Sequence, residues 1–385
     1  MSILRTFSSA ASRPFFTPPM TGVNGSNYWE KVKTFPTQIS CWNFLWVNTD
    51  NSVVYGAEDG NHGDVPKWTF TDGEYIPSSE LILNASRQVS ISRSGDLAVN
   101  ILLGTPNYLQ FLEEILGTWT VVNQVAFEYK LSTGMLLYFS QSGNSVVHFY
   151  SKQSPLNVNQ FIGWCSIFKN LSGYWTQILN TNVAENGMVP SSAGAVSGNG
   201  EYFAAYYFSI NKVTVFKWRG VTTSATIDDD WIESLSLTTD KAISGVYLNE
   251  YGDVLLVTTY VYSGGGSGYV GYQITYTAYK LNGSTWSQMG TPITVSANDY
   301  GTGTPVPRGQ ILNKNGDVFV VREDASIISR SIKIYKWDGQ AWNLVGSPIS
   351  GIRIGSAIFL DENGSKITIS KDQYATPLEQ YRYIS

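Results

Sequence analysis

Apolar and polar residues follow one another in short runs along most of the chain, and two local patterns recur. The first is a tight turn of Ser, Asn or Asp with Gly, followed by an apolar run, as in 92–103 (SRSGDLAVNILL), 249–260 (NEYGDVLLVTTY) and 313–321 (NKNGDVFVV). The second is an aromatic run, a Gly turn and a run that begins at Trp, as in 279–290 (YKLNGSTWSQMG) and 335–346 (YKWDGQAWNLVG). Short apolar or alternating runs bounded by Gly turns are typical of strands, so both patterns predict β-hairpins.

The aromatic residue after the second turn marks the length of the repeating unit. It recurs at steps of 44 to 56 residues, at Trp29, Tyr75, Trp119, Trp175, Trp231, Trp286 and Trp342. A unit of this length, with several short strands and two Gly turns, is typical of a four-stranded β-propeller blade. Seven markers therefore predict an all-β chain that forms a seven-bladed propeller of antiparallel blades.

The two ends of the chain carry complementary parts of one unit. After Trp342 there is one more turn and strand at 361–369 (DENGSKITI) and an aromatic run at 380–385, but no further Gly turn with Trp. The missing strand lies at the N-terminus, around Trp29. We expect this strand to join the C-terminal blade and close the ring, because closure leaves no exposed sheet edges at a gap. The propeller then spans 25–385, preceded by an extended arm at 1–24.

Composition agrees with an all-β chain and argues against several classes of partner. The chain has 36 Gly, 24 Tyr, 17 Phe and 12 Trp, with only 14% charged residues, which favours strands and turns over helices. The formal net charge is -5 and no Lys/Arg cluster occurs, so no nucleic acid partner is expected. No apolar run approaches the roughly 20 residues of a membrane helix, and no secretory signal pattern is present. The sequence predicts a soluble protein without membrane insertion.

Few residues of the chain are suited to catalysis or metal binding. Cys41 and Cys165 lack CxxC spacing and are expected to be free, buried thiols. With His62 and His148 as the only histidines, His-rich metal sites are excluded. No nucleophile elbow, phosphate-binding loop or HExxH motif occurs. We expect no catalytic residue, no cofactor and no metal, although a site assembled from several blades at the channel would leave no local signature.

Oxygen-bearing turns raise the question of calcium. The segments 313–317 (NKNGD) and 361–364 (DENG) are such turns, and the densest acidic run is Asp228 to Asp230. A calcium cage takes about six to eight oxygens, normally with carboxylates at alternate positions. Asn occupies most of these places here, which favours ordinary hairpin turns and a solvated acidic loop.

The tryptophans fall into two groups. Those of the marker series are interpreted as packing residues that cover the seam between neighbouring blades, with sugar-stacking platforms as the alternative. The tryptophans outside that series are the better candidates for a ligand surface, with core packing as the alternative: Trp42, Trp46, Trp164 and Trp218.

The two patterns together resemble the FG-GAP type of β-propeller repeat, the kind found in the ligand-binding head of integrin α chains. The resemblance is clearest at 249–293 and 313–349. That family's calcium loops alternate three Asp before a Gly, and this chain departs from them at every turn, so metal binding is not carried over. Divergent copies of the repeat are also similar to proteins encoded by large DNA viruses of algae and protists.

The N-terminal arm has the composition of a docking segment. It contains Arg5 and Arg13, no acidic residue and three prolines, which disfavour helix. Because it leaves from an outermost strand, we expect it to project from the rim and to dock through Phe15 and Phe16 as apolar anchors and the two arginines as polar ones. Docking on another subunit, folding back on its own propeller and mitochondrial targeting are the alternatives.

These observations favour a non-enzymatic structural propeller that binds protein partners within a larger assembly and is tethered by its arm. The viral resemblance implies a virion, as a minor capsid or surface component; outside such an assembly, a cytoplasmic location is expected. The second hypothesis is a carbohydrate-binding, lectin-like propeller that acts in attachment. The third is a hydrolase or lyase with its site at the channel mouth.

Overall fold

The computed structural model describes most of the chain from Tyr28 onward. The described ranges are 28–39, 44–47, 53–57, 65–71, 74–82, 89–102, 104, 106–127, 136–153, 161–184, 194–207, 210–220, 231–266, 269–299, 308–324, 330–352, 357–370 and 376–384. The 30 named elements within these ranges are all β-strands. No helix in these ranges is long and apolar enough to cross a membrane. The all-β prediction is confirmed.

The described strands form seven sheets, and the first three along the chain are regular. These three are four-stranded and antiparallel, with their strands in chain order. Their strands are β2 (Phe44–Val47), β3 (Val53–Ala57), β4 (Val65–Thr71) and β5 (Glu74–Ile82); β6 (Val89–Ile91), β7 (Leu97–Leu102), β8 (Asn107–Ile115) and β9 (Thr118–Phe127); and β10 (Leu136–Phe139), β11 (Ser145–Gln153), β12 (Phe161–Leu171) and β13 (Tyr174–Ala184).

The next three sheets keep this order, and two of them have a divided outer strand. β21 and β22 both pair with β20, and β26 and β27 both pair with β25. The strands are β14 (Gly194–Val196), β15 (Tyr202–Tyr207), β16 (Lys212–Trp218) and β17 (Trp231–Thr238); β18 (Ala242–Leu248), β19 (Val254–Gly266), β20 (Tyr269–Asn282), β21 (Thr285–Gln288) and β22 (Ile293–Asp299); and β24 (Val318–Asp324), β25 (Arg330–Trp337), β26 (Trp342–Leu344) and β27 (Ile349–Ser350).

The seventh sheet combines the two ends of the described chain. Its order is β1 (Tyr28–Ile39), β30 (Thr376–Ile384), β29 (Lys366–Ser370), β28 (Ala357–Leu360) and β23 (Arg308–Gln310). β1 and β30 pair antiparallel from Tyr28 opposite Ile384 to Ile39 opposite Thr376. The expected partnership between the N-terminal strand and the C-terminal strands is therefore present.

One strand departs from the predicted antiparallel blades. β23 pairs parallel with β28 of the seventh sheet, and its neighbour Leu312 makes only an isolated bridge to Phe319 of β24. Gly309 permits this, because it has φ 103° and a Cβ at this position would lie 2.1 Å from the carbonyl oxygen of Ile358. A glycine allows the two backbones to approach more closely than any other residue would.

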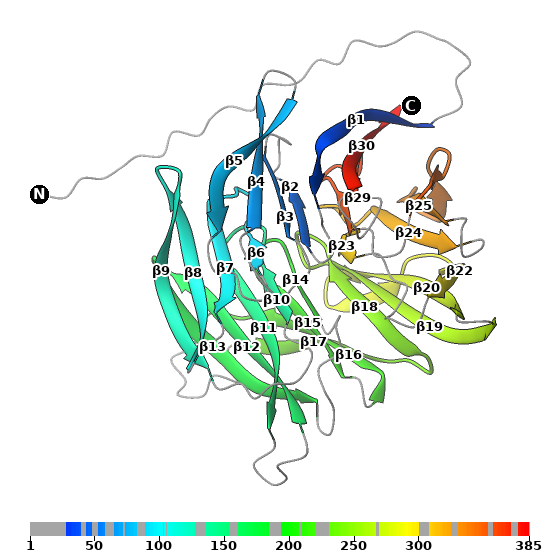
Figure 1. The fold of residues 1–385 in the computed structure, drawn as a ribbon. Coiled ribbons are helices and arrows are strands. Elements are labelled where there is room, and N and C mark those ends of the chain that lie inside the picture. The colour runs from blue at the N-terminus through cyan, green and yellow to red at the C-terminus, as the bar shows by residue number, and fades with distance from the viewer. Residues whose placement is uncertain are drawn as a thin grey trace, which may run out of the picture.

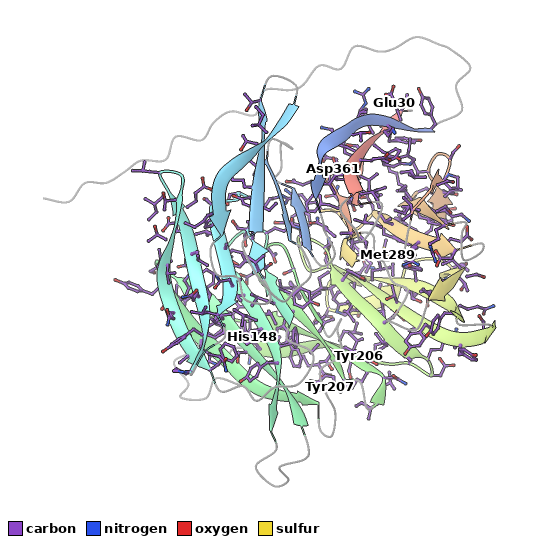
Figure 2. The ribbon with its side chains drawn as sticks, in the orientation of Figure 1. Glu30, His148, Tyr206, Tyr207, Met289 and Asp361 are labelled. Carbon is purple, nitrogen blue, oxygen red and sulfur yellow. The ribbon has the colours of Figure 1, made fainter. Side chains whose placement is uncertain are left out.

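The sheets follow one another around the molecule in chain order, and Figure 1 shows β1 and β30 side by side. Buried clusters bridge successive sheets, and side chains fill the space between them (Figure 2). One cluster joins Tyr55 of β3 with Ile91 of β6 and contacts Phe359 of β28. The hydrophobic core thus lies between the faces of neighbouring sheets.

The marker tryptophans pack in these seams. The indole N–H of Trp29 donates to the carbonyl oxygen of Val345 at 2.9 Å, and that of Trp342 donates to Met289 at 2.9 Å. Trp175 stacks on Phe111 of the preceding sheet with ring centroids 4.4 Å apart. A buried indole that donates a hydrogen bond adds orientation to its large apolar contact. The packing interpretation of these three residues is confirmed; the side chain of Tyr75 lies outside the described residues.

Candidate functional site

The first sequence pattern forms the same turn six times in the described chain. The side-chain oxygen of the first residue accepts a hydrogen bond from the backbone N–H of the sixth at 2.9–3.2 Å. The fourth residue is always Gly with φ between 70° and 80°, and its N–H donates to the carbonyl of the first residue. Ser, Asn and Asp favour such turns because their side chains replace a backbone acceptor. The turns are 92–97, 140–145, 197–202, 249–254, 313–318 and 361–366.

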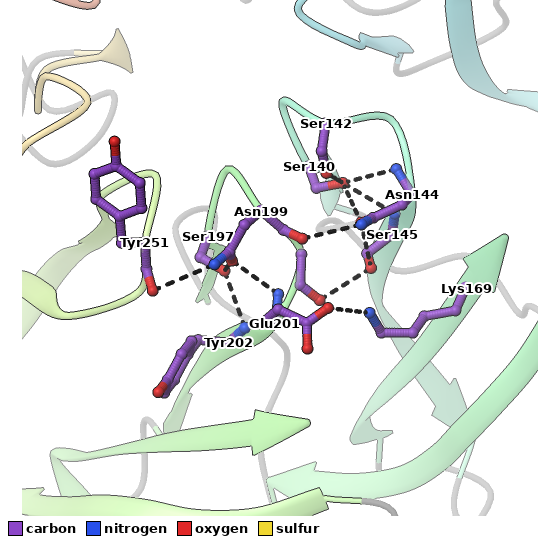
Figure 3. A network of polar contacts seen from close by, with 11 residues as sticks. Ser140, Ser142, Asn144, Ser145, Lys169, Ser197, Asn199, Glu201, Tyr202 and Tyr251 are labelled. Atoms are coloured by element: carbon purple, nitrogen blue, oxygen red, sulfur yellow. Dashed lines mark hydrogen bonds and ion pairs between the residues drawn. The ribbon is translucent and has the colours of Figure 1, made fainter. Parts of the chain in front are cut away.

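Backbone hydrogen bonds link each of these turns to the next. Among them, Arg93 N–H donates to the carbonyl of Gln141 at 2.9 Å, and Glu250 N–H donates to that of Lys314 at 3.2 Å. Side chains add further links, as Figure 3 shows for Asn144, whose amide donates to the carbonyl of Asn199 at 3.0 Å. We call these six linked turns the turn ring. They hold one end of six sheets in a fixed relation.

The second positions of the turn ring bring together charged residues from different sheets. The guanidinium of Arg93 contacts Glu250 at 3.1 Å and also pairs with Glu362. The ammonium of Lys314 lies 3.6 Å from the second oxygen of Glu362. Two cations and two carboxylates therefore form a neutral group, which we call the charge cluster. Arg93 joins turns that lie more than 150 positions apart in the sequence.

A missing side chain makes room for the charge cluster. Gly198 occupies the second position of its turn, and a Cβ there would lie 2.0 Å from an oxygen of Glu250. Burial lowers the pKa of the Arg93 guanidinium, while Glu250 acts in the opposite direction. Arg93, Glu250 and Glu362 are largely buried and each has an opposite partner, so the cluster is suited to holding sheets together.

Comparison with known proteins bears on the fold. No protein-family model matches the chain, and no curated protein matches it. Among solved structures, the β-propeller domain of Cps50 (Swd1) from Myceliophteria thermophila is similar, with a TM-score of 0.53 and 10% identity over 93% of this chain and 100% of that one. Hydrazine synthase from Kuenenia stuttgartiensis matches 55% of this chain and 67% of that one at 15% identity, with a TM-score of 0.42. The chain has a β-propeller fold.

The propeller also buries two residues that would be reactive if exposed. His148 lies on β11, where its ring stacks with Tyr150 and meets the edge of Phe127. Burial lowers the pKa of His148 to about 3, and its Nε2 has no hydrogen-bond partner among the described residues. Burial raises the pKa of Cys165, a free thiol as expected. Both groups are uncharged at neutral pH and lie within the core.

Of the four predicted ligand-surface tryptophans, only Trp218 has a described side chain, so the prediction that they form a ligand surface stays a prediction. Trp218, on β16, is half-buried against Trp231, with ring centroids 5.2 Å apart, and the Lys169 ammonium lies 5.1 Å from its ring. Trp46 and Trp164 lie on β2 and β12, but their side chains are outside the description. Trp42 and the arm residues Arg5, Arg13, Phe15 and Phe16 lie outside the described residues, as do Cys41, His62 and Asp228 to Asp230.

The charge cluster was missed by the motif search, although a signal for it exists. Placing the turns side by side shows Arg, Gln, Gly, Glu, Lys and Glu at their second positions. Charged residues of both signs at one position of a circular repeat converge at one end of the propeller, so this comparison predicts an ionic network.

Proposed function

We propose that the chain is a seven-bladed propeller, closed by its N-terminal strand, that serves as a non-enzymatic interaction module within a larger assembly. The described strands supply seven sheets, and β1 completes the sheet formed by the C-terminal strands. The contact of Phe359 with the cluster around Tyr55 joins the last sheet to the first one. These contacts support one closed ring of blades.

The position of β1 carries the proposed tethering role. β1 is the outermost strand of its sheet, and Tyr28 at its start is 44% exposed. The propeller is therefore joined to the preceding residues at an outermost strand, a position that supports the proposal that the arm binds a neighbouring molecule. In this proposal Phe15 and Phe16 occupy an apolar site on that partner, while Arg5 and Arg13 bind its carboxylates.

β1 is held in place by contacts with two sheets. It pairs with β30 at both of its ends, with two irregularities between them, and the indole of Trp29 donates to the carbonyl of Val345 in the neighbouring sheet. Ion pairs of Arg382 with Glu30 and of Lys31 with Glu379 lie along the same strand pair. These contacts hold β1 to its own sheet and to the neighbouring one.

The turn ring supports the role of a rigid platform. Its links join six sheets at one end, so surfaces on different blades keep their relative positions. Similarity of the repeat to proteins of large DNA viruses favours a virion as the assembly.

The experiment compares the full chain with a chain that begins at Gly22. Each is expressed in cells that produce the assembly, and the fraction that sediments with large particles is measured together with the thermal unfolding temperature. We expect the shortened propeller to unfold at an unchanged temperature and to leave the particle fraction. Continued sedimentation with a lower unfolding temperature would instead identify the arm as an internal strap.

A glycan array with the same two proteins separates the carbohydrate-binding alternative. Interaction through the arm predicts no glycan signal from either protein. Binding that survives removal of the arm and is lost in Trp218→Ala would favour a lectin-like function and contradict the proposal.

A further inference from the structure

Asparagine followed by glycine is the dipeptide in which a side-chain amide is lost most easily, and four such pairs lie in the described chain. Glycine has no side chain to shield its backbone nitrogen, so that nitrogen can attack the carbonyl carbon of the asparagine side chain. The pairs are 199–200, 282–283, 315–316 and 363–364. Because the two residues are the same in each pair, differences in reactivity between the pairs are set mainly by the fold.

Three of the pairs belong to the turn ring, where the glycine nitrogen is engaged. The N–H groups of Gly200, Gly316 and Gly364 donate to the carbonyl oxygen of the first residue of their turns, at 2.9, 3.1 and 3.1 Å respectively. A Cβ at these glycines would lie 2.1–2.7 Å from an atom of a neighbouring sheet. Attack by the nitrogen therefore requires that a closely packed turn first opens.

The fourth pair lies in the turn between β20 and β21 and has neither restraint. Asn282 pairs with Thr285, so Gly283 and Ser284 form the turn, and all four residues are exposed. Among the described residues the N–H of Gly283 has no acceptor, and no atom lies within 4 Å of a Cβ at this position. The Gly283 nitrogen can therefore approach the side chain of Asn282 without the loss of a turn hydrogen bond.

The side chain of Asn282 is also held less firmly than its counterpart in the next sheet. Asp338, at the equivalent position between β25 and β26, accepts two backbone N–H groups and the Asn343 amide at 2.7–2.8 Å. Asn282 donates to the hydroxyl of Ser287 at 3.3 Å, and its carbonyl oxygen accepts no hydrogen bond from the described residues. A single long, exposed hydrogen bond is a weak restraint, so the carbonyl carbon can turn toward Gly283.

We propose that Asn282 is a site of spontaneous deamidation, in which the backbone nitrogen of Gly283 displaces the side-chain amide. A bond forms between this nitrogen and Cγ of Asn282. The bond from Cγ to the amide nitrogen breaks, and ammonia leaves with the proton of the backbone N–H. Water then opens the cyclic imide at either carbonyl and gives aspartate or isoaspartate, without oxidation or reduction. This inference does not depend on the proposed function.

The reaction alters the outer part of this sheet. It replaces a neutral amide with a carboxylate, and isoaspartate also lengthens the main chain within a two-residue turn. The pairing of Leu281 with Trp286 adjoins that turn, and the indole of Trp286 donates to the hydroxyl of Ser234 in the preceding sheet at 3.0 Å. We expect isoaspartate in place of Asn282 to weaken this contact and to speed hydrogen exchange of the β21 amides.

The test incubates the full chain in mildly alkaline water enriched in heavy oxygen and follows the four pairs by peptide mass spectrometry. Because the other three pairs must first break the hydrogen bond of their glycine, Asn282 should gain the label at least about ten times faster than they do. In concentrated urea the turns are lost, and the four rates should become similar. Equal rates in the folded chain, or a faster reaction at any other pair, would overturn the proposal.

A substitution provides the second measurement. Asn282→Gln keeps an amide but places its carbonyl one carbon further along the side chain, so the more acidic form should no longer accumulate in isoelectric focusing. Asn315→Gln, at an exposed position of the turn ring, is the matched control and should leave that accumulation unchanged. An acidic form that still accumulates in Asn282→Gln contradicts the assignment.

Glycosylation is the competing modification of the same residue. Residues 282–284 have the N-x-S pattern of a glycan acceptor. A sugar found on Asn282 in freshly made protein would overturn the proposal, because its amide nitrogen would then be bonded to the glycan. A mass equal to that of the unmodified peptide at the start of the incubation supports it.

Discussion

The turn ring and the outer strands are built from the same repeat, yet they differ in how much variation they permit. Each described turn of the ring repeats one hydrogen-bond pattern, with a glycine at one position and a short polar side chain at another. The outer strands share a seam-packing aromatic residue but range from the charged β1 to the uncharged β9. The turn ring preserves the geometry of the propeller, and the outer strands are free to vary and to carry specific interactions.

The largest effect is expected where an outer strand meets the core. Trp342 is buried in the seam and bonded to Met289, so Trp342→Ala should lower the free energy of unfolding by about 3–5 kcal/mol. Leu116 is fully exposed, and Leu116→Ala should change the free energy of unfolding by less than about 0.5 kcal/mol. Urea unfolding of both variants measures the difference. Similar losses for the two would contradict the division between seam and rim.

Two glycines with similar backbone angles provide the next test. Gly252 of the turn ring has φ 71°, and a Cβ there would lie 2.2 Å from the ring of Tyr202. Gly283, in the turn between β20 and β21, has φ 64° with no atom within 4 Å of such a Cβ. Gly283→Ala should cost about 1 kcal/mol from backbone strain alone, whereas Gly252→Ala should cost about 3 kcal/mol because the clash adds to it. Equal losses in the free energy of unfolding, measured by thermal unfolding, would show that the turn ring is not tightly packed.

Two ion pairs, one in the turn ring and one on an outer strand, allow the same comparison of the two regions. A double-mutant cycle of Arg93→Met and Glu250→Gln should give a coupling energy of about 2 kcal/mol, because both groups are largely buried. The pair of Arg382 and Glu30 is exposed, and its cycle should give less than about 0.5 kcal/mol. Raising the salt concentration should reduce the second value more than the first. A negligible coupling between Arg93 and Glu250 would remove the charge cluster as a fastening between blades.

The smallest effect concerns His148 at acidic pH. Its pKa is about 3 in the folded chain and about 6.5 when unfolded, so the unfolded chain binds the extra proton between these values. The contribution to stability is present above pH 6.5 and is lost as the pH falls, by about 1.4 kcal/mol at pH 5.5. The free energy of unfolding is measured at pH 7.5 and at pH 5.5 for His148→Phe and for the unaltered chain, and the extra loss in the unaltered chain is the contribution of His148. If both proteins lose the same free energy between the two pH values, His148 is accessible to protons in the fold.

Local signals in the sequence were sufficient for much of the architecture. Turn residues such as Asn313 and Gly316 specify a turn of six residues, so the strands on either side could be predicted. The marker tryptophans recur at a fixed place in the unit, so the packing between sheets could be predicted as well. The pairing of β1 with β30 followed from counting incomplete units. The propeller fold is supported by a solved structure, whereas the FG-GAP relationship and the viral context stay predictions.

The features that escaped prediction depend on contacts between distant segments. The parallel pairing of β23 with β28 depends on the close approach that Gly309 allows. The charge cluster depends on Arg93 reaching turns of other sheets, and on Gly198 leaving room for a carboxylate. The exposure of Val122 is set by a bulge that other outer strands share without exposing an apolar residue. Periodicity specifies the unit, but such contacts depend on how the units meet.

The most direct test of the proposed function is assembly of the full chain with Phe15→Ala and Phe16→Ala in cells that produce its assembly. The matched control is Ile210→Ala, which removes an exposed apolar side chain of the propeller itself. We predict that the doubly substituted chain unfolds at an unchanged temperature but is absent from the sedimenting particles, while the control sediments normally. Normal incorporation of the doubly substituted chain would contradict the claim that the arm tethers this propeller to its assembly.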